Sequence, residues 1–587
     1  MGTTNIEDIY ELSPLQQGML LHTVHDGASD MYLGQHVYIV DGPLDVDALI
    51  QAWRQVFESH PALRTSFHWD GLDKPLQLVH RDVEPPAHRE DWSGMDQELQ
   101  RTRLDLLMAK ERAAGFDLTV APLQRLHLIR LGDHRHAVAW THHHLLLDGW
   151  SVPVFMNEVM THYQSLTVGG PLPRPAPPYR DYIAWLQRQD MDAAEGFWKK
   201  TLAGVTPGHL VPLQPPGPRG TGAVERRVVS IAGTIEDSLR DAAARHQVTV
   251  SAVLQAAWSV VLRRYTGRAD VVFGCVSSGR PAELPGVDRM VGMFVNTLPV
   301  PVTVPSDGEV GRWLRDIQDN YAAIRRYEFS PLSDIKRWAG APGQQLFDTL
   351  LVVNNYSFTV QAGDSLAGQL TVRSQTGFDK VSVPLALIVT PAPVSELDLL
   401  YHRDRFDAGF AADALDCLLA TLTAITRCDR IEQVMPAAGP VPDLVPAHHQ
   451  PDTPPSPQHQ HPEPAVPPAT PEEEAIAAVY RDILGLAHID VTASFFEMAG
   501  TSFDAVRAVG RIEGATVTML ALNPSARELA AALAVAGHDD VDEELDAEIA
   551  ELEREVAQKA ELSKLLTERV EVQQAAGQMP RDENRGR

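Results

Sequence analysis

The histidine-rich stretch at residues 136–151 reads HAVAWTHHHLLLDGWS. Its first part, 136–141, has the composition of a strand that ends at the histidines. Ser151 suits the N-cap position of a following helix, with Pro153 tolerated in the first turn. The three histidines, the acid and the glycine are therefore predicted to lie in one strand-to-helix loop. Loops held between rigid elements are where catalytic groups usually lie.

Three interpretations of this loop are open. In the structural one, the histidines are a polar strand end and Asp148 has only a capping role. In the metal one, His143 or His144 ligates zinc with Asp148, although there is no HExxH helix and no convincing third ligand. In the acyl-transfer one, an imidazole acts as the base, because its unperturbed pKa lies near neutral pH, and Gly149 permits close approach of a substrate. The fixed spacing of four specified residues argues against the purely structural interpretation.

Around the loop, helical and strand-like patterns alternate over most of the first 435 residues. Helices are predicted at 46–58, 151–165, 236–244 and 251–264. Strands are predicted at 35–40, 124–130, 136–141, 269–276 and 348–354. Such a mixture favours an α/β (α+β) protein with two lobes.

The chain has 587 residues, which is too many for one hydrophobic core, since cores stop growing at roughly 250–300 residues. A formal charge of −28 argues against nucleic acid as a partner, because phosphates require a basic stripe. No run of about 18 apolar residues is found, so no membrane span is expected. The acidic start, MGTTNIEDIYELS, is atypical of a secretory signal.

The three cysteines, Cys275, Cys417 and Cys428, lie in apolar surroundings without CxxC spacing. They are predicted to be buried structural thiols rather than a redox or metal site. Three thiols without a disulfide pattern fit a reducing compartment, so a cytoplasmic location is expected.

Composition changes sharply at residues 436–469, which are rich in Pro, Gln and His and are predicted to form an extended linker. A short helical unit is predicted at 470–536, starting with the amphipathic stretch EEEAIAAVYRDILG. An acidic helix and tail follow at 537–587. Within that tail, 540–573 has two open interpretations: a coiled-coil or docking helix, and a solvated amphipathic segment.

The histidine loop resembles the HHxxxDG signature of nonribosomal peptide synthetase condensation domains, relatives of chloramphenicol acetyltransferase. Other stretches resemble further motifs of that family, in family order. They are SPLQQGM (13–19), HPALRTSF (60–67), YRDYIAW (179–185), VGMFVNTL (291–298), LFDTL (346–350) and NNY (354–356). Together the motifs cover about residues 7–435.

The resemblance implies two acetyltransferase-like lobes, at 1–175 and 176–435, that form a V. The active site would lie in a tunnel between the lobes. Carrier domains would insert phosphopantetheine arms from opposite faces, with the donor on one side and the acceptor on the other.

By its position, His144 would be the family's catalytic histidine, with His143 and Gly149 beside it in the site. Asp148 would be structural and would pair with Arg280, and an Arg–carboxylate pair can be bidentate. His144 would orient the acceptor nucleophile, or take its proton, as it attacks the donor thioester to give an amide or ester.

Related subfamilies with other activities resemble this chain less. Heterocyclisation domains replace the two histidines with an acidic pair, whereas both histidines are kept here. Epimerisation domains usually read DGVSW, whereas residues 148–152 read DGWSV. The SPLQQGM opening is more similar to the subtype that takes L-configured donors.

Residues 494–503, SFFEMAGTSF, resemble the FFxxGGxS loop of a peptidyl carrier protein, in which Ser502 would accept phosphopantetheine. Ala499, Thr501 and Phe503 depart from that pattern, and the stretch after Ser502 is several residues short. A second interpretation therefore stays open: Ser502 is only a helix N-cap, in a degenerate carrier.

No adenylation domain is recognisable, so the resemblance implies an adenylation enzyme acting in trans and donor and acceptor carrier proteins as partners. The segment 540–573 is a candidate for helix-mediated docking or dimerisation. Phosphopantetheine would be present on the partner carriers and on Ser502. Two functions are weighed: a condensation enzyme, and an inactive condensation-like platform that binds carriers or tailoring enzymes. The intact HHxxxDG residues favour the enzyme.

Overall fold

In the computed structural model, the strand predicted at 136–141 forms and is longer than expected: β7 spans Arg135–His143. It pairs antiparallel with β2 (Leu33–Asp41) on one side and β6 (Gln124–Gly132) on the other. The β2 ladder runs on to the pair Leu33 and His143, so backbone pairing keeps the chain extended through two more residues.

This longer strand corrects the prediction that all three histidines lie in a loop. His142 and His143 are the last two residues of β7, and only His144 follows the strand. Because successive side chains of a strand point to opposite faces of the sheet, His142 and His143 lie on different faces.

The structure describes most of the chain up to residue 435 and part of a small helical unit after it. The described residues are 5–26, 30–69, 72, 74–172, 174–205, 224–231, 233–341, 344–354, 365–366, 370–378, 383–390, 396–435, 466–484, 486, 488–495, 498, 505, 508–515, 519–520 and 523–536.

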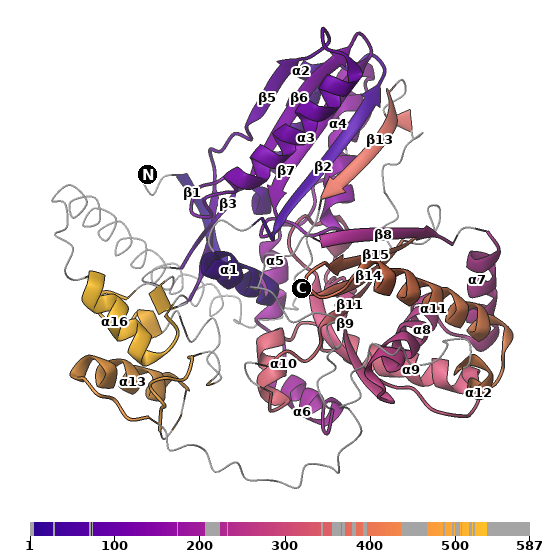
Figure 1. Ribbon diagram of the computed structural model, residues 1–587. Coiled ribbons are helices and arrows are strands. Elements are labelled where there is room, and N and C mark those ends of the chain that lie inside the picture. The colour runs from indigo at the N-terminus through magenta and orange to yellow at the C-terminus, as the bar shows by residue number, and fades with distance from the viewer. Residues whose placement is uncertain are drawn as a thin grey trace, which may run out of the picture.

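The first lobe is a six-stranded sheet in the order β12-β13-β2-β7-β6-β5, with helices on both faces (Figure 1). A three-stranded sheet, β1-β4-β3, lies beside it. The other elements of this part of the chain are β1 (Ile6–Glu11), α1 (Pro14–Asp26), α2 (Val46–Ser59), η2 (Pro61–Arg64), β3 (Thr65–His68), β4 (Leu76–His80), β5 (Ala87–Asp91), α3 (Gln97–Ala114) and α4 (Ser151–Val168).

Aromatic residues fill the space between the sheet and the paired helices α2 and α4. Trp140 of β7 contacts Trp53 of α2 and Phe155 of α4, with ring centroids 5.2 and 5.0 Å apart. On the other face, Met108 of α3 packs with Val37 of β2. The alternating apolar side chains of β2 and β7 thus bury both faces of the sheet.

One strand of the first sheet comes from far along the chain. Strand β13 (Leu370–Phe378) pairs antiparallel with β2 from Thr371 opposite Asp41 to Phe378 opposite Gln35, and carries the short β12 (Ser365–Leu366) at its edge. Figure 1 shows β13 beside β2 in the upper lobe. A division of the chain into lobes at 1–175 and 176–435 therefore assigns β13 to the lobe in which it does not lie. The predicted domain boundaries stay predictions.

The second lobe is another six-stranded sheet, in the order β10-β9-β11-β14-β15-β8. Its strands are β8 (Val224–Ser230), β9 (Asp270–Ser277), β10 (Asn296–Thr303), β11 (Thr349–Val353), β14 (Leu385–Thr390) and β15 (Glu396–His402). Its helices are α5 (Arg180–Leu186), α6 (Met191–Thr201), α7 (Thr234–His246), α8 (Val250–Thr266), η3 (Val287–Arg289), α9 (Val310–Arg325), α10 (Leu332–Trp338), α11 (Ala408–Arg427) and α12 (Ile431–Val434).

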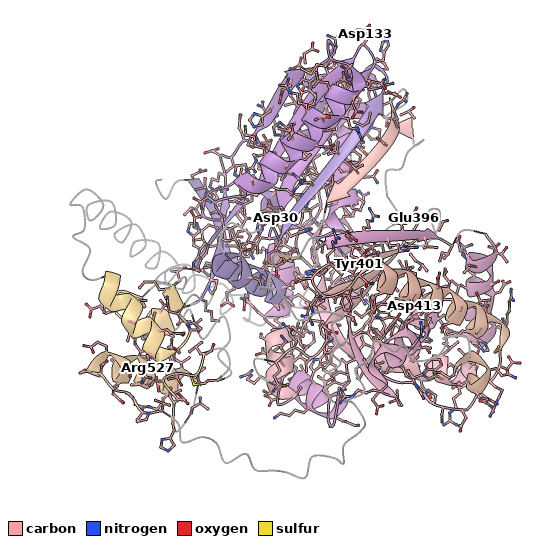
Figure 2. All side chains as sticks on the ribbon, viewed as in Figure 1. Asp30, Asp133, Glu396, Tyr401, Asp413 and Arg527 are labelled. Carbon is pink, nitrogen blue, oxygen red and sulfur yellow. The ribbon has the colours of Figure 1, made fainter. Side chains whose placement is uncertain are left out.

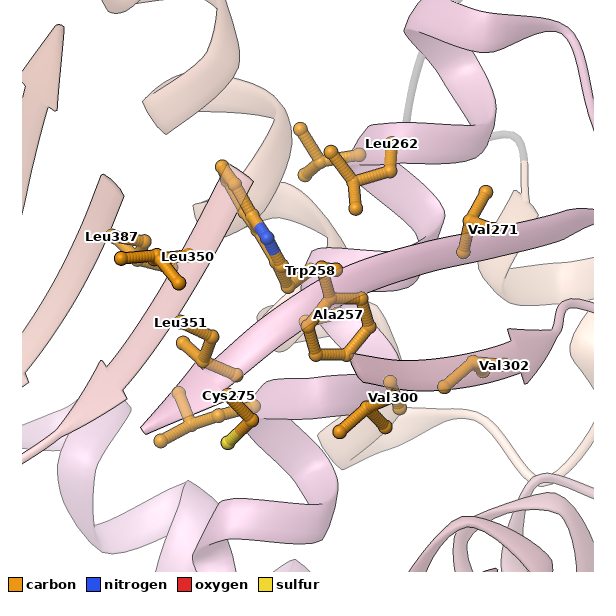
Figure 3. Close-up of a cluster of buried hydrophobic side chains, with 14 of the residues drawn as sticks. Ala257, Trp258, Leu262, Val271, Cys275, Val300, Val302, Leu350, Leu351 and Leu387 are labelled. Carbon is orange, nitrogen blue, oxygen red and sulfur yellow. The ribbon is translucent and has the colours of Figure 1, made fainter. Parts of the chain in front are cut away.

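The core of the second lobe is built around α8, in which every residue from Ala252 to Leu262 is buried. Trp258 of α8 is fully buried among the apolar side chains of the sheet, including Leu351 of β11 and Val300 of β10 (Figure 3). The strands predicted at 269–276 and 348–354 form as β9 and β11, and the helix predicted at 251–264 forms as α8.

Helix α11 is long and apolar enough to cross a membrane by length and composition alone, with a mean hydropathy of 1.5. Half of that stretch is buried inside the protein. Its Phe410, Leu418 and Leu422 belong to the core of the second lobe, which is the burial of a core helix.

The three cysteines are free: Cys275 and Cys417 are buried and Cys428 is half-buried. Burial raises the pKa of the Cys275 thiol to about 11, which keeps that thiol protonated and poorly nucleophilic near neutral pH. The prediction of buried structural thiols is confirmed for Cys275 and Cys417.

The small unit beyond residue 465 is helical, with α13 (Pro471–Leu484) and α16 (Ala526–Ala536) as its described helices. Tyr480 and Phe495 meet edge to face in its core, with ring centroids 4.6 Å apart. Arg527, labelled in Figure 2, holds α16 to α13 by donating to Glu473 at 2.9 Å. Ser502, the linker over 436–465 and the segment 540–573 lie outside the described residues.

Candidate active site

His144 is the first residue after β7, and backbone contacts hold it there. Its N–H donates to the carbonyl oxygen of Tyr32, at 2.9 Å. Its ring Nδ1 lies 3.4 Å from the carbonyl oxygen of Leu147. Because a carbonyl oxygen only accepts, Nδ1 carries the proton in this contact, and Nε2 is then the nitrogen with a lone pair. The side chain is half-buried, whereas its neighbours in the sequence are buried.

His143 is buried, and its Nδ1 accepts the N–H of Leu145 at 3.1 Å. Burial, aided by the nearby His144, lowers the pKa of His143 to about 3, so this ring is neutral near pH 7. The hydrogen bond folds the chain back immediately after the strand. His143 therefore shapes the loop that carries His144.

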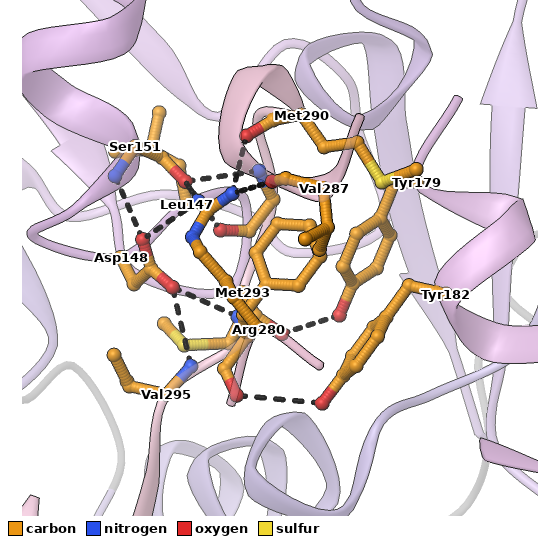
Figure 4. A network of polar contacts seen from close by, with 12 residues as sticks. Leu147, Asp148, Ser151, Tyr179, Tyr182, Arg280, Val287, Met290, Met293 and Val295 are labelled. Carbon is orange, nitrogen blue, oxygen red and sulfur yellow. Dashed lines mark hydrogen bonds and ion pairs between the residues drawn. The ribbon is translucent and has the colours of Figure 1, made fainter. Parts of the chain in front are cut away.

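Asp148 is fully buried and uses both carboxylate oxygens on backbone N–H groups (Figure 4). Oδ2 accepts from Phe294 at 2.9 Å and from Val295 at 3.2 Å, and Oδ1 accepts from Ser151 at 2.8 Å. Two of these three donors belong to the second lobe. The carboxylate thus fastens the loop of the first lobe to the 291–295 segment.

Arg280 lies beside Asp148, as predicted, but the pair is not bidentate. The closest approach is 3.7 Å, between Nη2 and Oδ1. The guanidinium instead donates to the carbonyl oxygens of Val287 and Met290 and lies over the ring of Phe294, 4.0 Å from its centroid. Burial lowers the pKa of Arg280, and the neighbouring Asp148 opposes that shift. A bidentate pair does not form because Asp148 is occupied by backbone donors.

Ser151 is not the N-cap of α4, which corrects the prediction. Trp150 occupies that position, and Ser151 is the first helical residue. Its hydroxyl donates to Gly292 O at 2.8 Å and accepts from Gly292 N at 3.2 Å and from Arg280 Nη2 at 2.9 Å. Asp148 takes the capping role by accepting the Ser151 N–H. The Ser151 hydroxyl therefore bonds to the second lobe instead of capping the helix. Its partners are far away in the sequence, so no local pattern could indicate this role.

Two tyrosines, Tyr182 of α5 and Tyr179 immediately before that helix, hold the 291–295 segment from within the second lobe. Tyr179 donates its hydroxyl to the carbonyl oxygen of Met293 at 2.5 Å, and Tyr182 donates to that of Phe294 at 3.4 Å. Gly292 must be glycine here, because a Cβ would lie 2.2 Å from the Tyr179 ring. The motifs at 179–185 and 291–298 thus pack against each other, a contact that their sequence separation hides.

The other predicted site residues are less informative. Gly149 is half-buried on the loop between Asp148 and Trp150. Its predicted role beside the substrate stays a prediction.

Within the described ranges, no group of three or more His, Cys, Asp or Glu side chains is arranged to hold a metal ion. The arrangement can supply a partly exposed imidazole on a rigid loop, which suits proton transfer.

The chain matches two protein families. Residues 6–431 match the Condensation domain family, and residues 474–533 match the Phosphopantetheine attachment site family, whose members carry 4'-phosphopantetheine. Relatives include linear gramicidin synthase subunits D and B of Brevibacillus parabrevis, 38% and 37% identical over 415 and 426 residues. These matches cover 68% and 72% of this chain but 8% of each relative.

Solved structures share the fold. The starter condensation domain of rhizomide synthetase has a TM-score of 0.61 at 19% identity, covering 72% of this chain and 96% of that domain. A four-domain nonribosomal peptide synthetase bound to AMP and glycine has a TM-score of 0.63 at 18% identity, covering 82% of this chain and 36% of the larger one. The predicted fold class, two acetyltransferase-like α/β lobes followed by a small carrier-like unit, is confirmed.

Condensation domains of nonribosomal peptide synthetases are acyltransferases that form peptide bonds. The first family match covers well over half of the chain and includes every residue of the loop that carries His144. This protein therefore belongs to the condensation-domain family of nonribosomal peptide synthetases, with a phosphopantetheine-attachment domain after the condensation domain.

Proposed function

We propose that this protein joins a carrier-bound acyl or peptidyl thioester to an acceptor amine, with His144 as the catalytic residue. The observation that carries the proposal is the state of the His144 ring. It is the half-buried imidazole of the loop, and its Nδ1 contacts the carbonyl oxygen of Leu147. That contact leaves Nε2 as the basic nitrogen.

The reaction balances without a further reagent. The acceptor nitrogen attacks the thioester carbonyl, a C–N bond forms and the C–S bond breaks. His144 takes the proton from the nitrogen and returns it to the leaving thiolate, which departs as a free thiol. Holding two tethered reactants together supplies much of the acceleration, up to about 7–11 kcal/mol in the best intramolecular cases.

The partners in this proposal are a donor carrier, an acceptor carrier and an adenylation enzyme acting in trans, all in the cytoplasm. The chain spans 8% of the length of linear gramicidin synthase subunits D and B, which are therefore much longer proteins. The two lobes contribute the bond-forming step, and neighbouring proteins supply activated amino acids. An ester product would need only an acceptor hydroxyl in place of the amine.

The alternative function is an inactive platform that binds carriers or tailoring enzymes. The buried hydrogen bonds of Asp148 and His143 favour catalysis over this alternative. These bonds fix the position of His144, and a surface that only binds partners has no need to hold an imidazole in one orientation.

Intact-protein mass spectrometry tests the bond-forming step. A donor carrier loaded with an acyl group and an acceptor carrier loaded with an amino acid, both from neighbouring synthetase proteins, are mixed with the protein. The acceptor carrier is expected to gain the mass of the acyl group, and the donor carrier to lose it. Absence of transfer across a panel of loaded carriers, with the protein folded, would favour the platform.

Ser502 is proposed as the attachment point of the arm in the small unit. Incubation with coenzyme A and a broad-specificity phosphopantetheinyl transferase is expected to add one arm, visible as a single mass increase of the whole chain. Ser502→Ala should abolish the increase, and Thr501→Ala, which removes the neighbouring hydroxyl, should keep it. If the parent gains no mass while a control carrier is modified, the unit is a degenerate carrier.

A further inference from the structure

A column of contacting rings runs from the core of the first lobe to the loop of the active site. It begins at Trp53 of α2 and Phe155 of α4, which both contact Trp140 of β7. Trp140 stacks on His142, two residues along the strand, with ring centroids 4.5 Å apart and planes at 26°. His142 then meets the ring of His144 edge to face, at 5.4 Å and 73°.

The ring of His142 is held from three sides. His36 of β2 stacks on it at 5.4 Å, with planes at 10°. Gly34, its partner across the ladder, leaves the room that the ring occupies, since a Cβ there would lie 2.4 Å from His142 Cε1. Trp140 covers the ring from the core side. His142 therefore cannot turn without displacing a neighbouring ring or strand.

Hydrogen bonding within the protein does not explain an imidazole at this position. The side chain is fully buried, and neither ring nitrogen has a polar partner among the described residues. Burial and the nearby His144 hold the pKa of His142 well below its ordinary value, so the ring is neutral near pH 7. A buried polar ring without partners costs free energy, and the rings of His36, Trp140 and His144 lie against this one.

We propose that His142 is a positioning residue for His144: as the last ring of the column, it fixes the orientation of the catalytic imidazole. This inference rests on the proposed role of His144 and adds a residue outside the HHxxxDG signature. A ring seated against His142 keeps its Nδ1 at the carbonyl oxygen of Leu147. Without that contact, His144 samples other orientations, and fewer encounters place Nε2 at the acceptor.

The proposal requires a flat ring at position 142 and not an imidazole as such. Two substitutions test this requirement, one that removes the ring and one that keeps a ring. In the carrier-to-carrier transfer assay, His142→Leu is expected to lower kcat about tenfold, the loss that an edge-to-face contact can explain. KM for the acceptor carrier should stay unchanged, and the melting temperature should stay equal or rise, because an unpartnered polar ring is replaced by an apolar side chain. His142→Phe keeps a flat ring and should remain within about twofold of the parent.

The matched control is His136, which lies on the same strand and the same face, six residues before His142. It is also buried, and its Nδ1 lacks a partner among the described residues. His136→Leu should leave kcat unchanged. Gly34→Ala gives an independent route, because it pushes the His142 ring out of its slot. Gly34→Ala alone should lower kcat. In the His142→Ala background, where no ring occupies the slot, Gly34→Ala should cause no further loss of kcat.

A second measurement needs no substrate. Carbethoxylation of His144 by diethyl pyrocarbonate, followed by peptide mass spectrometry, should be faster in His142→Leu than in the parent, because a loosened ring exposes both nitrogens. His142→Phe and His136→Leu should match the parent. Equal modification rates in all four proteins, or a Phe variant as slow in transfer as the Leu variant, overturn the proposal. If the unsubstituted protein transfers no acyl group, the proposed function is wrong. The rates of His144 modification would still show whether His142 positions the His144 ring.

Discussion

Replacing His144 with alanine is expected to lower the rate of acyl transfer between carriers by about 10²–10⁴-fold, the usual contribution of a positioned general base. The fold should be unaffected, because the side chain is half-buried and the backbone contact to Tyr32 does not need it. Residual transfer is expected, since the two tethered reactants are still held together. Single-turnover transfer, followed by mass spectrometry of the acceptor carrier, measures the loss.

A suitable control is His134→Ala, which removes an exposed histidine from the turn at the opposite end of β7. It should transfer at the parental rate. Binding of the donor and acceptor carriers should be alike in both variants, because His144 is proposed to act on the tethered acceptor group and not on the carrier itself. Parental turnover in His144→Ala would remove the catalytic assignment and leave the fold assignment standing.

Replacing Asp148 with alanine is expected to cost about 3–5 kcal/mol of stability, the typical cost of breaking a buried ion pair on one side. Three backbone N–H groups, on Ser151, Phe294 and Val295, would lose their acceptor. Arg280 would lose the ion-pair partner that lies 3.7 Å away. Activity should fall as well, because the loop would no longer be fastened to the second lobe.

Denaturant unfolding measures the loss of stability, and amide hydrogen exchange locates it. Exchange should quicken first at residues 291–295, where two of the freed N–H groups lie. Arg280→Ala in the Asp148→Ala background should cost less than it does alone, since the two side chains interact. A variant that unfolds like the parent yet transfers nothing would instead point to a chemical role for Asp148.

Both substitutions act on residues that the sequence singled out, but their partners could not be read from it. The HHxxxDG spacing, together with the other motifs in family order, was sufficient to predict His144 and Asp148 as site residues. The pairing of Asp148 with Arg280 was predicted, but its geometry, a single approach at 3.7 Å, could not be read from the sequence. A carboxylate binds whatever donors lie closest, and here those are backbone N–H groups from 146 and 147 residues further along the chain.

His142 illustrates the same limit. In the sequence it is the first of three histidines, and a strand-to-helix loop was the simplest prediction for all three. Its actual place in β7 depends on Leu33 and Gly34 of β2, which extend the ladder and open the slot for the ring. Neither residue is close to the histidines in the sequence, so no local pattern could indicate the stack.

The sequence by itself determined the α/β class, the family and the order of the units, and it pointed to His144 as the candidate catalytic histidine. These follow from local periodicity and from residue types at fixed spacing, which are written along the chain. The tertiary structure decided which donors Asp148 uses, that Ser151 bridges the lobes, that β13 joins the first sheet and that His142 lies against His144. Each of these depends on contacts between distant segments, whose pairing is set by the packing of the whole domain.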